Sequence, residues 1–180
     1  DSKKRRFRRA YIEVARKQGK SEEAAAVGNI GLFFDGEGAP QIFSAATTRD
    51  QAKEVFNAAK VMAKYLSDDS ETLGKQIRVL EHSISNKENS GFFQAVSSDS
   101  GTLDGKKPHI AITDEYHAHP TSGVLKVMET GMGSRKQPLS FIITTAGFNT
   151  AGPCFRMRQV ATEILEGKKV AETFFTIIYT

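Results

Sequence analysis

The sequence predicts an α/β domain with a central, mostly parallel sheet and helices on both faces of that sheet. Short apolar runs that suit strands alternate along the chain with longer segments whose apolar residues recur at helical spacing. Several of the short runs are continuously apolar, which is typical of parallel strands that are covered on both sides. The chain of 180 residues, 39% of them hydrophobic, is long enough for one domain with a substantial core.

The predicted strands are short runs rich in β-branched and apolar residues, bounded by turn residues or charges. We expect Asn86–Asn89 to form the turn between the third strand and the fourth. The strands are predicted over Arg8–Ala15, Gln41–Thr47, Gln76–Ser85, Gly91–Ser97, His109–Glu115, Leu139–Gly147 and Glu172–Thr180.

The predicted helices have recognisable starts and ends. The first carries acidic residues in its first turn, which favour the positive end of the helix dipole. The second has a long apolar stripe and is expected to end at the polar segment Ser67–Thr72, and the third has Pro near its start and Gly past its end. These helices are predicted over Ser21–Phe34, Thr48–Leu66, Pro120–Gly133 and Cys154–Lys168, with a loop over Ser98–Pro108.

The charge pattern, the cysteine content and the lengths of the apolar stretches limit the kinds of protein that this chain can be. Lys3–Arg9 carries six positive charges in seven residues, which is either a contact for an anionic partner such as nucleic acid or a solvated tail. Cys154 is the only cysteine, which excludes an intrachain disulfide and a cysteine-based zinc site and fits a reducing, cytosolic setting. No apolar stretch approaches the ~20 residues of a membrane span.

The first strand is followed by Gly19-Lys20-Ser21, the end of a phosphate-binding loop pattern. Val14 occupies the position of the first glycine of that pattern, so the motif is incomplete. Its context still favours a phosphate site, because the loop leads from a strand into a helix whose free N–H groups attract anions. Lys20 is expected to reach phosphate oxygens, and the Ser21 hydroxyl is expected to bind Mg²⁺.

Two later strands also end in residues that suit phosphate chemistry. The apolar run Ile110–Thr113 ends at Asp114 and Glu115, which fit a partner of Mg²⁺ and a general base for the attacking water. Alone, an Asp-Glu pair is better explained by an ordinary surface turn. The run from Leu139 ends at Thr144 and Thr145, which fit either a sensor of the terminal phosphate or an ordinary β-branched strand end.

Three segments together resemble the ATPase domain of the large terminase subunit of tailed bacteriophages, a motor that packages DNA into proheads. They are VARKQGKS (Val14–Ser21), IAITDEYHAHP (Ile110–Pro120) and FIITTAGFNTAGP (Phe141–Pro153). The resemblance covers the chain from about Arg8 to Thr180. It implies a RecA-like P-loop NTPase fold of the additional-strand, catalytic-Glu class, with ATP and Mg²⁺ as ligands.

The resemblance also implies a role for each motif residue. The family commonly uses a divergent phosphate loop with an early basic residue, which Arg16 matches here. Glu115 matches the catalytic glutamate, and Arg16 and Lys20 are expected to stabilise the transferred phosphoryl group; Ser21 and Asp114 are expected to hold Mg²⁺. The expected nucleotide-binding residues are Arg16, Lys17, Gln18, Gly19, Lys20, Ser21 and Glu22, and the expected coupling segment is Thr144, Thr145, Ala146 and Gly147.

The resemblance extends to partners and location. It implies double-stranded DNA, a portal protein, a small terminase subunit and a homo-oligomeric ring, with the isolated domain monomeric. The protein would act in the host bacterial cytoplasm and transiently at the prohead portal, without a membrane. We expect residues 1–180 to form a single ATPase domain of a longer protein whose C-terminal nuclease domain, and hence endonuclease activity, lies outside it.

Some features depart from the family or leave choices open. The slot of an arginine that reaches a neighbouring subunit's nucleotide holds Asp104, so Lys106, Lys107 or Arg135 would have to substitute. The alternatives are another RecA-like DNA motor of the helicase or recombination type, and a nucleotide-binding scaffold without hydrolysis.

His117 and His119 lie close to two carboxylates in the sequence. They could belong to a metal site, but no third ligand is evident, and either a structural role or a supporting role behind the site residues is favoured.

Overall fold

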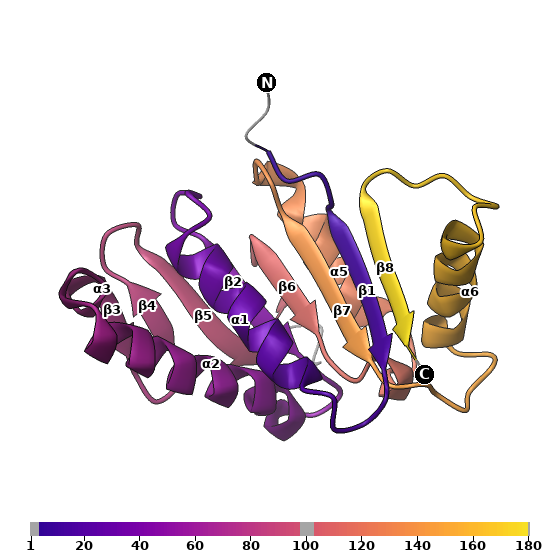
Figure 1. The fold of residues 1–180 in the computed structure, drawn as a ribbon, viewed down its shortest axis with the longest axis horizontal. Coiled ribbons are helices and arrows are strands. Elements are labelled where there is room, and N and C mark those ends of the chain that lie inside the picture. The colour runs from indigo at the N-terminus through magenta and orange to yellow at the C-terminus, as the bar shows by residue number, and fades with distance from the viewer. Residues whose placement is uncertain (1–3, 98–102, 180) are drawn as a thin grey trace.

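The structure, a computed structural model, describes residues 4–97 and 103–179. Its described residues form one eight-stranded sheet in the order β3-β4-β5-β2-β6-β7-β1-β8 (Figure 1). The strands are β1 (Arg9–Val14), β2 (Gln41–Ala45), β3 (Ile77–Val79), β4 (Ile84–Asn86), β5 (Gly91–Val96), β6 (Ile110–Thr113), β7 (Leu139–Thr144) and β8 (Phe174–Tyr179).

The six strands from β5 to β8 in this order pair in parallel, which confirms the predicted mostly parallel sheet. The three strands β6, β7 and β1 lie next to one another in its middle. Since they run in the same direction, their carboxyl ends meet at one edge, the lower edge in Figure 1. That edge is where ligands bind in open α/β sheets.

The prediction of one strand over Gln76–Ser85 is wrong. This segment holds two short strands, β3 and β4, that pair antiparallel around a turn at residues 80–83. The N–H of Leu80 donates to the carbonyl of Ser83 at 2.8 Å and closes the turn. The predicted turn over Asn86–Asn89 lies between β4 and β5, and these strands also pair antiparallel. The sheet therefore ends in an antiparallel extension on the side away from β1.

Helices cover both faces of the sheet. α1 (Lys20–Phe33), α2 (Arg49–Asp69) and the short α3 (Glu71–Gln76) lie on the front face in Figure 1. α5 (Gly123–Gly131) packs on β6 and β7 from behind, and α6 (Pro153–Leu165) packs on β8. Short 3-10 turns, η1 (Tyr116–Ala118) and η2 (Met132–Ser134), precede and follow α5.

The two helix layers have separate cores, because alternate strand residues point to opposite faces. Ile12 and Phe141 belong to the larger core under α1 and α2. Tyr11 and Ile142, their neighbours in sequence, belong to a smaller core under α6. A third cluster under α5 includes Leu103, the first described residue after the gap in the predicted loop Ser98–Pro108.

The helix limits differ from the predictions at three places. α2 continues through Ser67–Asp69 and ends only where the Ser70 hydroxyl accepts the N–H of Leu73 and starts α3. α5 begins at Gly123 rather than at Pro120, because residues 120–122 form a bend that follows η1. α6 ends at Leu165. None of the helices among the described residues is long and apolar enough to cross a membrane.

Candidate active site

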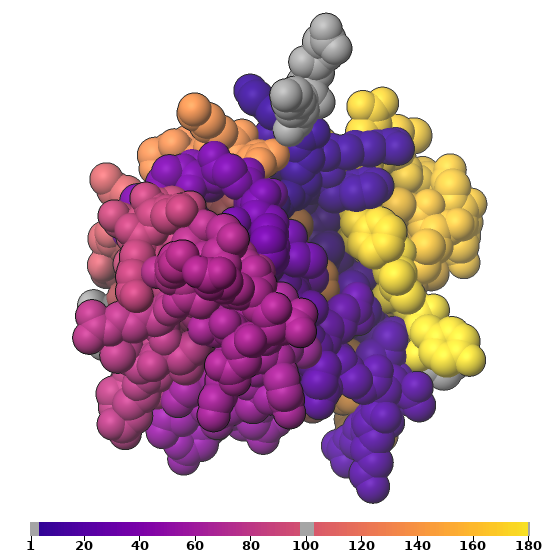
Figure 2. All heavy atoms as spheres, turned by 60° about the vertical axis from the view of Figure 1, so that its left-hand side comes forward, coloured from indigo at the N-terminus to yellow at the C-terminus, as the bar shows by residue number. Residues whose placement is uncertain are grey.

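The loop between β1 and α1 projects from the carboxyl edge of the sheet, at the lower edge of both views (Figure 1 and Figure 2). Lys17 and Gly19 adopt the left-handed conformation, with φ of 64° and 72°, and turn the chain directly into α1. Gly19 caps the helix and has no side chain to bond the first N–H groups of α1. Those groups face outward as an anion site, in the context that the incomplete motif predicted.

The side chains of this loop extend into solvent. Arg16, Lys17 and Gln18 are exposed, and among the described residues none of them forms a hydrogen bond or ion pair. Glu22 is exposed in the first turn of α1, and Ser21 is half-buried behind it. The phosphate loop is therefore an open surface whose charges are free for a ligand.

Lys20 and Glu115 form the contact that joins this loop to the end of β6. The Lys20 ammonium lies 2.6 Å from Oε1 of Glu115, and both side chains are largely shielded from solvent. Glu115 has a left-handed backbone with φ of 48°, which is uncommon outside glycine and tends to occur at functional sites. The strained residue directs its carboxylate across the sheet edge to the phosphate loop.

Asp114 lies beside this ion pair and is almost fully buried. Burial raises the pKa of its carboxyl from 3.8 to about 6, although the Lys20 charge and a hydrogen bond from the N–H of Glu115 act in the opposite direction. A nearby cation would favour the ionised form of such a group. The carboxylate of Asp114 and the hydroxyl of Ser21 are oxygen donors of the kind that Mg²⁺ prefers, so this pair suits that ion.

His117 occupies the space between Glu115 and the end of β7. Its Nδ1 atom lies 3.1 Å from Oε2 of Glu115, 3.1 Å from Oγ1 of Thr144 and 3.4 Å from Oγ1 of Thr145. Its backbone N–H donates to Oγ1 of Thr144 at 3.0 Å. In the sequence, the only sign that His117 contacts these residues is its position two residues after the expected catalytic glutamate.

His119 faces the other way and has a structural role. Its Nε2 lies 3.1 Å from the carbonyl oxygen of Asp114, and burial lowers the pKa of the imidazole. Within the described part of the chain no group of three or more His, Cys, Asp or Glu side chains is arranged to hold a metal ion.

The expected coupling segment divides into an anchored half and an exposed half. Thr144 and Thr145 are buried, and the Thr144 hydroxyl donates to the carbonyl of Thr145 at 2.9 Å. Ala146 and Gly147 are exposed. Gly147 nevertheless packs against His117, since a Cβ at this position would lie 2.8 Å from the His117 Cβ.

A buried polar cluster that the sequence analysis missed supports β1 from the α6 side. Glu13 is completely buried and accepts hydrogen bonds from the Tyr11 hydroxyl at 2.6 Å and from the Arg158 guanidinium at 2.9 Å. Cys154 lies 3.6 Å from the Tyr11 hydroxyl, and burial raises the pKa of its thiol, so the cysteine is a packed and unreactive group. The cluster ties α6 to the strand that carries the phosphate loop.

The three candidates for an arginine finger have different surroundings. The Arg135 guanidinium donates to the carbonyls of Lys107, Gly38 and Ala39 at 2.9, 3.1 and 3.1 Å, so it already has partners within the domain. The Lys106 ammonium lies 4.9 Å from the centre of the Phe43 ring. Lys107 is exposed and is the candidate that remains available to a neighbour.

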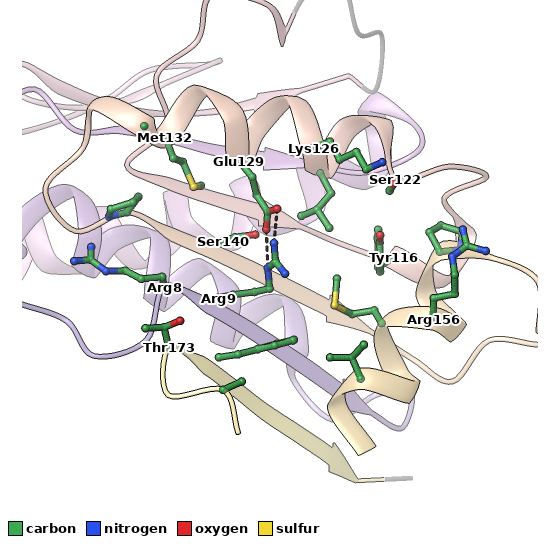
Figure 3. A pocket seen from close by; sticks show the side chains of 18 of the residues that line it. Arg8, Arg9, Tyr116, Ser122, Lys126, Glu129, Met132, Ser140, Arg156 and Thr173 are labelled. Atoms are coloured by element: carbon green, nitrogen blue, oxygen red, sulfur yellow. Dashed lines mark hydrogen bonds and ion pairs between the residues drawn. The ribbon is translucent and has the colours of Figure 1, made fainter. Parts of the chain in front are cut away.

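A large cavity lies away from this site, between α5 and α6 on the back of the sheet (Figure 3). It measures about 920 Å³ and is crossed by an ion pair in which Arg9 donates to both carboxylate oxygens of Glu129. Neither the phosphate loop nor Glu115 lines it. The open sheet edge, and not this cavity, therefore holds the residues that the sequence predicts to bind phosphate and to activate water.

Comparison with known proteins shows the family to which the chain belongs. A model of the family described as terminase large subunit, ATPase domain, matches residues 1–163. The chain belongs to this family. Protein YmfN of Escherichia coli (strain K12), a curated relative, is 49% identical over 77 residues, which are 43% of this chain and 17% of YmfN.

Solved terminase structures share the fold. The large terminase of bacteriophage HK97 aligns with a TM-score of 0.77 and 22% identity over 96% of this chain and 35% of its own. A large terminase from a thermophilic bacteriophage aligns with TM-scores of 0.64 with ADP bound and 0.63 with ATP-γ-S bound. Its identity is 14% and 16%, over 95% and 97% of this chain and 40% of its own. The terminase ATPase domain therefore has the RecA-like P-loop fold here, and the chain spans little more than a third of these terminases.

Proposed function

We propose that this domain hydrolyses ATP at the carboxyl edge of its sheet and that the hydrolysis drives double-stranded DNA into proheads. The observation that supports this most is the ion pair at 2.6 Å between Lys20 of the phosphate loop and Glu115 at the end of β6. It brings together a phosphate-binding cation and a general base from segments far apart in the sequence.

The nucleotide would lie along the phosphate loop and the start of α1. Its phosphates would accept the free N–H groups of the helix start and contact Lys20 and Arg16, with Lys17, Gln18, Gly19 and Glu22 forming the rest of the loop. Ser21 and Asp114 would hold Mg²⁺, which supplies charge neutralisation on the phosphate oxygens.

Binding of the triphosphate and activation of Glu115 would be a single exchange of partners. In the structure, the Glu115 carboxylate is paired with Lys20 at 2.6 Å and lies 3.1 Å from Nδ1 of His117. The phosphates compete for the Lys20 ammonium, because a polyanion attracts it more strongly than one carboxylate does. Glu115 would then be free to accept a proton from the attacking water, while Arg16 and Lys20 stabilise the transferred phosphoryl group.

Coupling to DNA movement would pass through Thr144, Thr145, Ala146 and Gly147. The buried half of this segment contacts His117 beside the catalytic carboxylate, and the exposed half leads toward α6. A displacement at the site would thus reach the helix layer on the back of the sheet.

The partners we propose are those of the packaging machine: double-stranded DNA, a portal protein, a small terminase subunit and further copies in a ring. The full protein would also carry an endonuclease, and it would work in the host cytoplasm and at the prohead portal. Lys107 is the most accessible residue for a trans contact with a neighbour's nucleotide.

The catalytic assignment predicts that Glu115→Gln lowers kcat for ATP by about 10²- to 10⁴-fold, the range typical for loss of a general base. Binding of ATP-γ-S should persist, because Lys20 and the loop amides are intact. Glu163→Gln, on the exposed face of α6, is the matched control. Steady-state phosphate release measures the effect, and equal turnover in Glu115→Gln and wild type would refute the assignment.

A further inference from the structure

Three functional groups surround one atom, Nδ1 of His117. They are Oε2 of Glu115 at 3.1 Å, Oγ1 of Thr144 at 3.1 Å and Oγ1 of Thr145 at 3.4 Å. One ring nitrogen therefore contacts both the carboxylate assigned to water activation and the segment assigned to coupling.

The hydrogen-bonding capacity of these groups determines how they can share this atom. A carboxylate of Glu115 only accepts hydrogen bonds. The Thr144 hydroxyl donates its one hydrogen to the carbonyl of Thr145 at 2.9 Å, so its oxygen is an acceptor toward His117. Glu115 and Thr144 therefore both need to accept the proton on Nδ1 of His117, and this single N–H is divided between them. The Thr145 hydroxyl lies farther from Nδ1, at 3.4 Å.

The backbone and the Cβ of His117 also contact the coupling segment. The backbone N–H of His117 donates to Oγ1 of Thr144 at 3.0 Å. Gly147 lies so close to the His117 Cβ that a side chain at 147 would bring two Cβ atoms to 2.8 Å. A change in the position of the ring is thus transmitted to both ends of Thr144–Gly147.

We propose that His117 is the positioning residue that links the catalytic carboxylate to the coupling segment. This rests on the proposed function of Glu115. While Glu115 is paired with Lys20, the N–H on Nδ1 is divided between Glu115 and Thr144. When the triphosphate takes Lys20 and Glu115 turns to water, the N–H passes to Thr144, and the coupling segment takes a second position.

The two imidazole nitrogens can be tested separately. The side-chain amide of asparagine reaches the place of Nδ1, and that of glutamine reaches the place of Nε2. The three contacts of the imidazole ring with Glu115, Thr144 and Thr145 all use Nδ1, so His117→Asn should preserve the link and His117→Gln should break it. A histidine that merely fills space would tolerate both changes to a similar extent. His82→Gln is the matched control, because His82 is exposed and, among the described residues, its side chain forms an ion pair with the neighbouring Glu81, at 3.5 Å, and lies away from Glu115.

Phe148 provides a direct readout of the coupling segment. It follows Gly147 and is fully exposed, so chymotrypsin can cleave after it. In the full-length protein with Mg²⁺, we expect ATP-γ-S to change the rate of this cleavage several-fold in wild type, in His117→Asn and in His82→Gln. In His117→Gln the rate should stay the same with and without nucleotide, although fluorescent ATP analogues still bind. The fragment that ends at Phe148 is quantified by mass spectrometry.

Turnover provides the second readout. We expect His117→Gln to lower kcat about tenfold with little change in KM, the factor that corresponds to about 1.4 kcal/mol in the barrier. His117→Asn should recover most of this loss.

A nucleotide response in His117→Gln equal to that of wild type would overturn the proposal, as would no response in wild type or equal losses in the Asn and Gln variants. Full turnover in Glu115→Gln would instead refute the catalytic assignment, and the cleavage assay, which needs no hydrolysis, would still decide the role of His117.

Discussion

The phosphate loop and the ends of β6 and β7 lie at the same sheet edge, but they differ in how fully their side chains are bonded. Arg16, Lys17 and Gln18 are exposed and form no bond with the described residues around them. At the other side, His117 and Thr144 are joined by two hydrogen bonds and contact Glu115 and Thr145. The loop side chains are exposed to any ligand, whereas the side chains at the ends of β6 and β7 are bonded to one another.

Lys20 is the residue where these two regions meet. It starts α1 at the phosphate loop and pairs with Glu115 of the organised side. A ligand that binds the open side must therefore act on the bonded side by removing one ion-pair partner. Changes at the exposed residues of the loop should alter ligand binding and phosphoryl transfer but not the free energy of unfolding, whereas changes in the network should alter both turnover and the free energy of unfolding.

On the bonded side of the sheet edge, Asp114→Asn is expected to have the largest effect of the changes considered below. Loss of a carboxylate for Mg²⁺ should lower Mg²⁺-dependent turnover by about 100-fold or more, equivalent to about 2.7 kcal/mol or above. The same change should stabilise the nucleotide-free domain at neutral pH by about 1 to 3 kcal/mol, because burial raises the pKa of Asp114 from 3.8 to about 6.

The sign of this stability effect depends on pH. The folded protein holds the Asp114 proton more tightly than the unfolded chain, so wild type loses stability as pH rises from about 4 to about 6. The advantage of Asp114→Asn should thus be full at pH 7.5 and vanish near pH 4. Thermal denaturation across this range measures it, and an advantage that grows toward acid would contradict the assigned pKa.

The smallest effect is expected from Arg16→Ala in the open loop. Loss of one charged contact to phosphate should raise KM for ATP about 3- to 10-fold. The melting temperature should stay the same, because Arg16 is exposed and has no partner among the described residues. A clear fall in melting temperature would show that Arg16 is bonded within the domain. The loop would then not differ from the His117 network in how fully its side chains are bonded.

The sequence predicted the parallel sheet well because its strands are apolar and end in polar residues. It failed at Gln76–Ser85, where the turn at residues 80–83 interrupts a run that has suitable strand composition on both sides. It also ended α2 too early, because Ser67–Asp69 looks like a break until Ser70 is seen to cap the next helix. Tertiary contacts decide where such helices and strands end, and local propensity does not reflect those contacts.

Site residues that belong to a sequence motif could be predicted from the sequence. Site residues whose contacts depend on tertiary packing could not. Lys20, Asp114 and Glu115 follow strands, so the topology alone brings them to one edge. The buried Glu13 looks like an ordinary polar residue of a strand, and its partner Arg158 is 145 positions away. The sequence left open whether His117 has a structural role or supports the site residues, because its contacts with Thr144 and Thr145 depend on the adjacent placement of β6 and β7.

The exchange of partners at Lys20 is tested most directly by a structure of the domain with Mg²⁺ and ATP-γ-S. The account predicts the triphosphate at the start of α1, with the Lys20 ammonium on phosphate oxygens and no longer within 2.6 Å of Glu115. Nucleotide bound in the cavity between α5 and α6, or bound at the loop with the Lys20–Glu115 pair intact, would contradict it.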